Sequence, residues 1–294
     1  MPEKANLEGS FSISGAYALS PMLKEWREGF IKLHPGVTIN ISETGTGQGL
    51  ADLTDGKVNL AMISRPLTDA EKESGVWVIP VARDGIAPIV NQKNPYIRRL
   101  MHQGLSPDEL QKLFTSDKPV RWGELLDSSG SGHAVVYTRA VGSGAADVFS
   151  EFLFRKSTDL KGIQVAGDEE MIKSVQNNIM AVGFCNFSFA FSVPEGGKRE
   201  NIQIVPFDLD YDNLIGRKEE PFKDLDNAHR SVWLGIYPER LCRELTVGSV
   251  GQPSDPLIKE FLKYIITEGQ EMVKESGLCE LNSVHLRSAL ESLE

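Results

Sequence analysis

Short apolar runs alternate with longer amphipathic segments along this chain, a pattern that predicts strands and helices in turn. Segment 18–33 repeats apolar residues every three or four positions and predicts a helix that ends before Pro35 and Gly36. Around it the sequence predicts strands at 11–14, 37–41 and 58–63 and a second helix at 47–55. The N-terminal part therefore reads β-α-β-α-β.

The same alternation continues to the C-terminus. Further strands are predicted at 76–81, 86–91, 134–138, 181–185 and 231–237, and helices at 106–114, directly after Ser143, at 168–177 and at 256–266. Residues 208–228 are rich in Asp, Lys, Glu and Asn and predict a surface excursion. Strands and helices that alternate in this way predict an α/β fold with helices on both faces of the strands.

Two β/α halves with strands that could cross between them predict two lobes joined by a hinge of two crossing segments. The strand at 86–91 reads as one of these crossings. We expect lobe 1 to be discontinuous, with residues 1–88 plus 230–294, and lobe 2 to contain residues 89–229.

The most informative stretch is 137–145, where an apolar, β-prone run ends in Arg139 and a Gly-Ser-Gly turn then precedes a helix. A helix start leaves backbone N–H groups without partners and carries about half a positive charge, so it can hold an anion. The planar guanidinium of Arg139 would pair with an oxyanion through two donors. A salt bridge from Arg139 to Asp147 or Asp84 is the alternative interpretation.

A second turn of this type, Thr-Gly-Thr-Gly-Gln-Gly at 44–49, follows the strand at 37–41 and precedes the helix at 47–55. Two such turns could converge on one anion. Either turn alone is more often an ordinary helix cap than a ligand site. Because both turns occur in one chain, a ligand site and two ordinary helix caps become about equally well supported.

Composition and charge narrow the function. A net charge of −10 over 294 residues disfavours general nucleic-acid binding, so an anion would have to be held by local geometry. The three cysteines are widely spaced and the five histidines are scattered, so no metal site or disulfide framework is predicted. Core packing is expected for Trp26, Trp77, Trp122 and Trp233, and no cofactor is predicted.

The sequence contains no catalytic signature. The glycine runs lack the Gly-Lys-Ser/Thr ending of a nucleotide loop, no HExxH occurs, and no serine lies in a nucleophile elbow. We therefore expect a binding protein and not an enzyme. A transferase built on α/β lobes would require a titratable residue beside Arg139, which the sequence does not identify.

Targeting signals leave the location open. No apolar run is long enough to span a bilayer, and residues 1–5 lack the basic region and apolar stretch of a signal peptide. This start fits a cytosolic protein or an exported protein whose signal has been removed.

Seven sequence segments occur here in a specific order and spacing: Ser14-Gly15-Ala16-Tyr17, 44–49, 61–67, 84–87, 105–122, 139–145 and 181–184. Together they make the chain resemble the phosphate-type solute-binding proteins that feed ABC importers, from residue 11 to about 281. The resemblance implies a type II periplasmic-binding-protein-like fold, a Venus-flytrap receptor whose interlobe cleft closes on a tetrahedral oxyanion without reacting with it. Phosphate is the leading ligand.

The resemblance also implies the setting and the ligand contacts. It implies an ABC importer permease as partner, a monomer, and an extracytoplasmic location, periplasmic or lipid-anchored at the cell surface, with the export signal absent from this sequence. By position, Arg139 is the ligand arginine, Ser143 and Gly144 serve the second lobe, and Thr46 and Gly47 are their counterpart in the first. The full set of implied ligand residues is Ala16, Tyr17, Thr46, Gly47, Ser64, Arg65, Arg139, Ser143, Gly144 and Ala145.

Three positions depart from the family pattern. Ala16-Tyr17 stands where the family often has Ser or Thr, although backbone amides could remain, and Ala145 stands where Thr is common. Ser64-Arg65 replaces a loop whose aspartate, in well-known members, accepts a proton from bound phosphate. Losing that carboxylate relaxes the demand for a protonated ligand, because a buried carboxylate repels a dianion. Arg65 is either a ligand residue or an exposed residue before Pro66.

The missing hydroxyls at Ala16 and Ala145 also favour an alternative function. In it the chain is an anion-sensing or adhesive module of the same fold, in which phosphate binding is altered or lost.

Overall fold

The computed structural model describes residues 7–126, 128–140, 142–192, 196–216 and 222–294. Residues 1–5, on which the absence of a signal peptide was judged, and residues 217–221 of the expected surface excursion lie outside the described residues.

The chain alternates strands and helices throughout, which confirms the α/β class. The strands are β1 (Glu8–Gly15), β2 (Gly36–Glu43), β3 (Leu60–Ile63), β4 (Val76–Asn91), β5 (Val135–Arg139), β6 (Ile163–Val165), β7 (Ala181–Asn186), β8 (Ile202–Ile204) and β9 (Cys242–Val250). The α-helices are α1 (Ser20–Leu33), α2 (Thr46–Thr54), α3 (Asp69–Glu73), α4 (Ile97–Gln103), α5 (Pro107–Thr115), α6 (Trp122–Leu125), α7 (Gly144–Phe152), α8 (Gly167–Gln176), α9 (Phe187–Ala190), α10 (Leu225–Trp233), α11 (Pro256–Ile266), α12 (Gln270–Val273) and α13 (Ser283–Glu291). Short 3-10 turns are η1 (Ser157–Asp159), η2 (Glu239–Leu241) and η3 (Lys274–Ser276).

The chain forms two compact units. Unit 1 consists of Met1–Arg83 and Glu244–Glu294, and unit 2 of Asp84–Arg243. Both boundaries fall inside strands, one in β4 and one in β9, so these two strands are the segments by which the chain crosses from one unit to the other. The sequence had suggested boundaries at 88/89 and 229/230.

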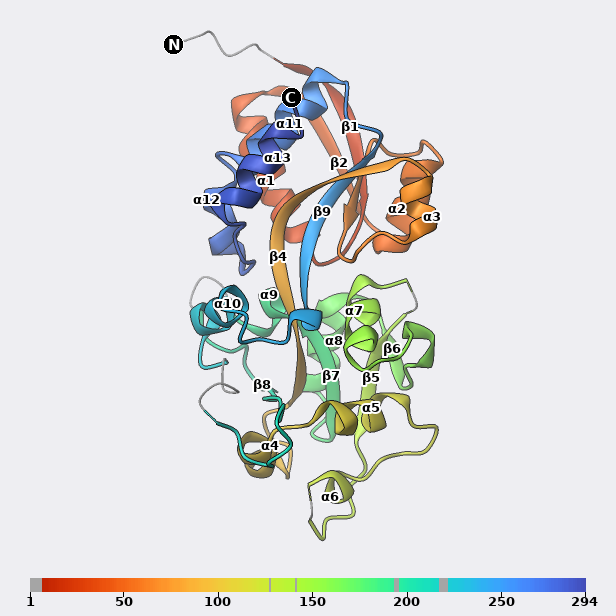
Figure 1. Cartoon of the computed structure of the whole chain (residues 1–294), viewed down its shortest axis with the longest axis vertical. Coiled ribbons are helices and arrows are strands. Elements are labelled where there is room, and N and C mark those ends of the chain that lie inside the picture. Colours follow the sequence, from red (N-terminus) through yellow and green to blue (C-terminus); the bar gives the residue numbers. More distant parts are fainter. Residues whose placement is uncertain (1–6, 127, 141, 193–195, 217–221) are drawn as a thin grey trace. The chain divides into compact units, whose positions relative to one another are not determined.

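Unit 1 is a sheet with helices on both faces (Figure 1). Its order is β2-β1-β3-β9, with β9 next to β4; β1 pairs in parallel with β2 and β3, and β3 pairs antiparallel with β9. The larger core packs α1 and α11 against one face, and Trp26 and Phe261 within it are fully buried. On the other face, α2 buries Leu50 and Leu53 against Ala61 and Ile63 of β3.

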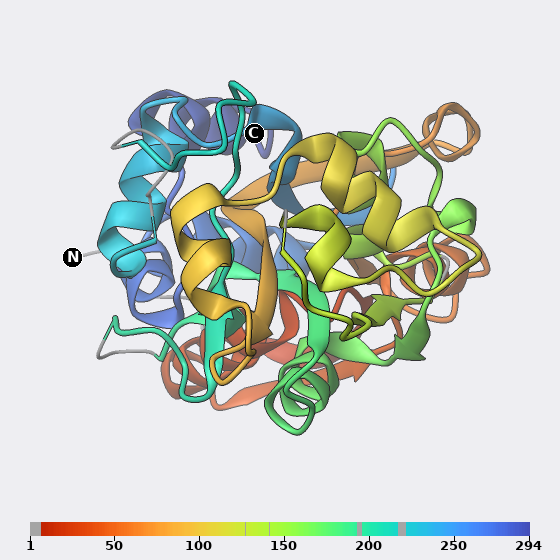
Figure 2. The ribbon, with the colours of Figure 1, turned by 90° about the horizontal axis from the view of Figure 1, so that it is seen from below.

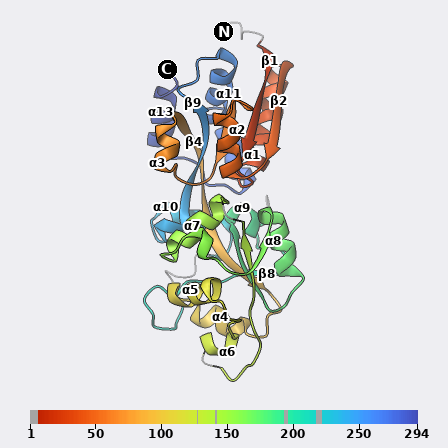
Figure 3. The same ribbon diagram turned by 90° about the vertical axis from the view of Figure 1, so that its right-hand side faces the viewer.

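Unit 2 is built on the order β8-β4-β7-β5-β6, in which β4 pairs antiparallel with β8 and β7, and β5 pairs in parallel with β6 and β7. Helices again cover both faces of the strands (Figure 3). Phe149 of α7 stacks on Phe184 of β7, with ring centroids 4.2 Å apart, while Met171 of α8 packs at Gly183 next to it. In Figure 2, α4 and α5, in gold and yellow, face the viewer.

Two predicted strands are confirmed but form a single strand, and one strand prediction was wrong. Residues 76–81 and 86–91 belong to one continuous strand, β4, because residues 83–85 stay extended; Arg83 exchanges backbone hydrogen bonds with Cys279. Residues 231–237 are the end of α10 and the turn after it. Asp224 caps this helix by accepting from Asn227 N at 2.8 Å, and Gly235, with φ of 65°, follows its end.

The α10 sequence misleads because its consecutive apolar residues suggest a strand. Only Val232 of these is buried, whereas Trp233 is 56% exposed and Leu234 61% exposed, so core packing is wrong for Trp233. The buried positions recur at helical spacing, at Leu225, Ala228 and Ser231. Part of the expected excursion at 208–228 is therefore helical, and the strand of this region is β9.

Gly49 sets how closely α2 approaches β1. A Cβ at this position would lie 2.5 Å from Gly15 Cα and 2.8 Å from Ser14 O, both backbone atoms that cannot move aside easily. The start of α2 can reach the end of β1 only because this side chain is missing.

We expect Gly49→Ala to destabilise unit 1 by about 1–3 kcal/mol, because overpacking against backbone outweighs the gain of about 1 kcal/mol in helix propensity. Urea denaturation measures the change. Gly197→Ala is the matched control, since nothing lies within 4 Å of a Cβ there. Equal stability of the two variants would contradict the close approach.

Candidate anion-binding site

Unit 1 carries the first of the two predicted anion-binding helix starts, at the start of α2; we call each of these helix starts an anion seat. Gly45 precedes the helix with φ of 84°, and the first helical bond runs from Gly49 N to Gly45 O at 2.9 Å. The N–H groups of Thr46, Gly47 and Gln48 therefore precede any helical acceptor. The first turn contains no acidic residue, so no side chain of this turn offsets the positive end of the helix dipole.

Thr46 and Ser64 are brought together beside this seat. Thr46 is 1% exposed and Ser64 3% exposed, and their hydroxyl oxygens lie 3.0 Å apart in a hydrogen bond. The Ser64 amide also donates to Thr46 Oγ1 at 3.2 Å. The loop after β3 is thus fixed to the first residue of α2, and two of the predicted ligand residues lie in contact.

Ala16 and Tyr17 form the turn after β1. Ala16 N donates to Met62 O at 3.0 Å, so this amide is used to hold the turn to β3. Gly15 O in turn accepts from Gly45 N at 2.9 Å, which joins the turn to the start of α2. The Tyr17 ring lies beside Gly45, 3.6 Å from where a Cβ would stand.

The Arg65 guanidinium forms an ion pair with a neighbouring carboxylate, that of Glu71. Its two terminal nitrogens donate to the two Glu71 oxygens, each at 2.7 Å, and Nη1 also donates to Pro66 O. Glu71 completes the capping box of α3 with Thr68, and its bond to Arg65 lowers the pKa of the Glu71 carboxyl. The Arg65 side chain is 12% exposed, so it is not the exposed residue of the alternative interpretation, and its contact with a ligand stays a prediction.

Unit 2 carries the second predicted seat at the start of α7. Ser143 is the N-cap residue, but its side chain makes no capping hydrogen bond. The first helical bond runs from Asp147 N to Ser143 O at 3.0 Å, so the amides of 144–146 precede it. Ala145 is 3% exposed, and Gly142 takes a φ of 87° in the turn.

Arg139 ends β5 directly before this turn and is 4% exposed. Its Nη1 lies 3.2 Å from Asp168 Oδ2 in an ion pair whose side chains are both almost completely buried. The sequence had offered Asp147 or Asp84 as a salt-bridge partner, and it assigned Asp168 only to a helix start. Asp168 does lie in the first turn of α8, and it serves Arg139 as well.

A polar network continues from Asp168 through residues that the sequence did not single out. Asn186 donates to Asp168 through its backbone N at 3.1 Å and its Nδ2 at 2.9 Å. Arg243 then donates to Asn186 Oδ1. Burial raises the pKa of the nearby Asp84 carboxyl to about 7, although Arg243 acts in the opposite direction. No motif marks Asn186 or Arg243, because they come from different strands.

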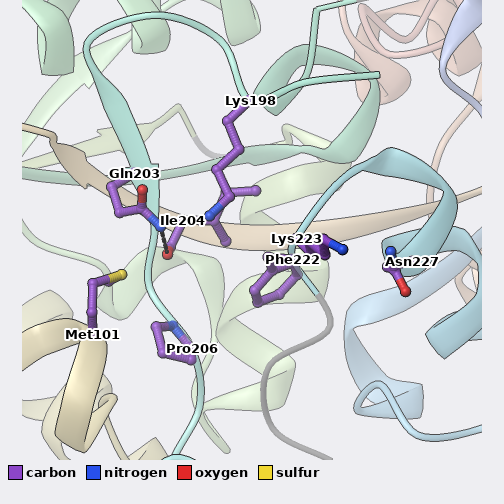
Figure 4. A pocket seen from close by; sticks show the side chains of 8 residues that line it. All are labelled: Met101, Lys198, Gln203, Ile204, Pro206, Phe222, Lys223 and Asn227. Carbon is purple, nitrogen blue, oxygen red and sulfur yellow. Dashed lines mark hydrogen bonds between the residues drawn. The ribbon is translucent and has the colours of Figure 1, made fainter. Parts of the chain in front are cut away.

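A separate cavity of about 480 Å³ opens in unit 2 (Figure 4). Its lining residues are Met101, Lys198, Gln203, Ile204, Pro206, Phe222, Lys223 and Asn227. Gln203 Nε2 donates to Ile204 O at 3.2 Å along one wall. None of the predicted ligand residues lines this cavity.

Asp208, Asp210 and Asp212 hold the carboxylates that could bind a metal, with one oxygen of each within 4.8 Å of the others. Asp208 already accepts from the amides of Asp212 and Asn213, at 3.2 and 3.1 Å, so it stabilises its own loop. These acidic residues are not among the predicted anion contacts. Among the described helices, none has the length and apolar character needed to cross a bilayer.

Comparison with known proteins identifies the family. The model of the PBP superfamily domain matches residues 2–268, and the chain belongs to this superfamily. The phosphate-binding protein PstS of Staphylococcus haemolyticus is 21% identical over 278 residues, covering 92% of this chain and 81% of the relative. The PstS of Pseudomonas aeruginosa strain PAO1 is 25% identical over 304 residues, covering 98% and 88%.

The fold has close counterparts among solved structures. A Clostridium perfringens protein, described as a phosphate ABC transporter substrate-binding protein and solved with bound phosphate, superimposes with a TM-score of 0.74 at 24% identity, covering 93% of this chain and all of the other. This likeness confirms the two-lobe, type II periplasmic-binding-protein-like fold expected from the sequence.

We expect Thr46→Val to destabilise unit 1 by about 1–3 kcal/mol, because the buried Ser64 amide and hydroxyl would lose their shared partner. Thr46→Ser keeps the hydroxyl and is the control. Urea denaturation of both variants measures the difference, and equal losses would argue against the hydroxyl contact.

The Arg65–Glu71 pair gives a pH-dependent prediction. Because the folded-state pKa of Glu71 is lowered, its ionised form stabilises the fold above the ordinary pKa of 4.5, and this contribution disappears as pH falls through the folded pKa. Glu71→Gln should be less stable than wild type at pH 7, by up to about 1 kcal/mol, and this deficit should be smaller at pH 3.

Asp69→Asn removes a carboxylate that is 94% exposed and pairs with Lys72, so it is the control for loss of charge in the same helix. Thermal unfolding at the two pH values gives the comparison. A deficit of Glu71→Gln that is the same at both pH values would contradict an ionised pair.

Proposed function

We propose that this protein is a solute-binding protein that captures an inorganic oxyanion, with phosphate as the leading ligand, and delivers it to an ABC transporter. The observation that carries the proposal is the pair of helix starts, α2 in unit 1 and α7 in unit 2, whose first amides precede any helical acceptor. Relatives named for phosphate binding match nearly the whole chain, which supports the same ligand.

The chemistry of the two seats suits a tetrahedral oxyanion. In this proposal Thr46, Gly47, Ser143 and Gly144 supply backbone N–H groups and hydroxyls to one anion. Arg139 contributes the positive charge. A hydrogen bond to a charged group contributes about 1.5–3 kcal/mol, and exclusion of water strengthens it. Such donors hold the ligand without any group that would attack it, which is the chemistry of a receptor.

The proposed ligand residues on the Ser64-Arg65 side contain no carboxylate. An anion there meets hydroxyl and amide donors, so a proton on the ligand is not required for binding. The Arg65 guanidinium is already matched by Glu71, and we retain it as a ligand residue only as a prediction. On this basis phosphate should lead over sulfate only narrowly.

The same proposal implies a location, a protein partner and an oligomeric state. A receptor for an importer works outside the cytoplasmic membrane, in the periplasm or anchored at the cell surface. It would present its anion to the permease of an ABC importer, and it would do so as a monomer.

One observation favours a second candidate function. Ala16 lacks a side-chain hydroxyl, and its amide is bonded to Met62 O, so this residue offers the anion fewer donors than the family pattern has. The second candidate is an anion-sensing or adhesive module with altered or lost phosphate binding. Absence of phosphate binding by calorimetry would favour it.

Ser143 provides the sharpest test. Since its hydroxyl makes no capping bond, Ser143→Ala should cost little stability but should raise the Kd for phosphate by about tenfold, through loss of one charge-assisted bond. Isothermal titration of ligand-stripped protein gives the Kd, and one phosphate per chain is expected.

The control is Ser106→Ala, the same change at another helix N-cap. Ser106 does accept from Glu109 N in a capping box, so this variant should lose about 1 kcal/mol of stability and keep its affinity. An unchanged Kd in Ser143→Ala would remove Ser143 from the ligand set. Failure of the wild type to bind phosphate would reject the proposed function.

A further inference from the structure

A buried group of charged side chains lies behind Arg139, and the proposed anion contacts do not use it. Asp84 comes from β4, Asp168 from α8, Asn186 from the end of β7 and Arg243 from the start of β9. Each is at most 5% exposed. All of them belong to unit 2, so their arrangement is internal to one compact body.

Asn186 joins the two arginines through Asp168. Arg243 donates to Asn186 Oδ1, Asn186 Nδ2 donates to Asp168 Oδ2, and Arg139 Nη1 pairs with that same oxygen. Guanidinium groups only donate and a carboxylate only accepts, so only one orientation of the Asn186 amide fits between them. The position of the Asp168 carboxylate, and with it Arg139, therefore depends on this bridge.

The charge of the group depends on one member. Arg139 and Arg243 bring two positive charges, and Asp168 and Asp147, which acts on Arg243 from the first turn of α7, bring two negative charges. With a neutral Asp84 the sum is zero, and with an ionised Asp84 it is −1. Charges buried in protein are screened much less than charges at the surface, so an anion bound at the start of α7 would sense this difference.

We propose that Asp84 is a specificity-determining residue that does not touch the ligand: by gaining or losing its proton beside Arg243, it sets the net charge behind Arg139 and so tunes anion affinity with pH. The inference rests on the proposed anion-binding function. Asn186 and Arg243 act as positioning residues that hold Asp168 against Arg139.

The surroundings of Asp84 place its titration in the relevant range. Its Oδ1 accepts from Gly85 N at 2.8 Å, and Ser188 Oγ donates to Oδ2 at 3.4 Å. The charged or titratable groups that face it are Arg243, Asp168, Cys185 and Tyr237. Burial and Asp168 raise the pKa of Asp84, Arg243 and the amide bonds lower it, and the balance is about 7.

The sign of the coupling follows from the charges. An anion in the seat repels ionised Asp84 and favours its neutral form, so binding should be accompanied by proton uptake near pH 7. Affinity should therefore be highest below pH 7 and should fall as pH rises through it.

The first experiment is phosphate titration calorimetry of wild type and Asp84→Asn at pH 6 and pH 8.5. Phosphate itself titrates in this range, but its titration affects both proteins equally and cancels in the ratio of their Kd values. We expect the ratio of wild-type Kd to Asp84→Asn Kd to be near one at pH 6 and about three to ten at pH 8.5. Asp84→Ser provides a second neutral side chain if the amide folds poorly.

Glu169→Gln is the matched control. It removes one negative charge next to Asp168 in sequence, but Glu169 is 56% exposed and pairs with Arg199 at the surface. Its Kd ratio to wild type should be the same at both pH values. A merely structural role for Asp84 would shift affinity or stability without producing the pH-dependent ratio.

The second experiment needs no ligand. Because the folded-state pKa of Asp84 is raised, native protein holds more protons than unfolded protein between about pH 4 and 7, and wild-type stability should fall with rising pH relative to Asp84→Asn. Urea denaturation at pH 5 and 8 measures this.

The outcomes separate the two claims. Phosphate binding with a Kd ratio that does not change with pH would overturn the role of Asp84 and leave the proposed function standing. Parallel stability profiles of wild type and Asp84→Asn would also overturn the inference. Failure of the wild type to bind phosphate at either pH would overturn the proposed function, and the coupling with it.

Discussion

The ion pair between Arg139 and Asp168 is the interaction on which the second unit's site depends. An arginine that is almost completely buried must have a charged partner nearby, since an unpaired buried charge costs several kcal/mol. The same partner reduces the attraction that Arg139 can exert on an anion. The site thus balances two requirements, stability of the folded unit and positive charge at the start of α7.

The network behind this pair resolves part of that conflict. Arg243 returns a positive charge to the group, and Asn186 links it by hydrogen bonds to the Asp168 carboxylate that pairs with Arg139. The geometry is held from several elements, β7, α8 and β9, so the fold fixes the position of the Arg139 side chain. An arginine held in this way would lose little side-chain entropy on binding an anion. The first unit uses neutral donors instead, with the Thr46–Ser64 contact fixing a helix start that has no acidic residue in its first turn.

The chain belongs to the PBP superfamily and has its type II fold, which shows the architecture but not the ligand contacts. The departures at Ala16, Arg65 and Ala145 have different structural consequences. Ala16 and Ala145 are buried small side chains, whereas Arg65 has acquired a bidentate partner in Glu71. A positive charge in this loop is therefore already matched within unit 1.

Much of this architecture could be predicted from the amino-acid sequence alone. Periodicity predicted the helices α1, α2, α5, α8 and α11, because their apolar residues recur every three or four positions, and Pro35 and Gly36 mark the end of α1. The strands β1, β2 and β7 were predicted from short β-prone runs, and β7 is buried at every position. The sequence also predicted both helix starts, since glycines next to Thr46 and Ser143 mark them locally. The remaining features depend on contacts between segments that are distant in the sequence or on burial in the folded chain. Of the strand-like residues 231–237, the first three end α10, whose buried positions recur at helical spacing, and the others form the turn after it. The partners of Arg139 and Arg65 could be identified only in three dimensions. Long-range pairs such as Arg139–Asp168 and Asn186–Arg243 join distant segments. The residues next to a buried charge in the sequence therefore do not indicate which carboxylate or amide will pair with it in the folded chain.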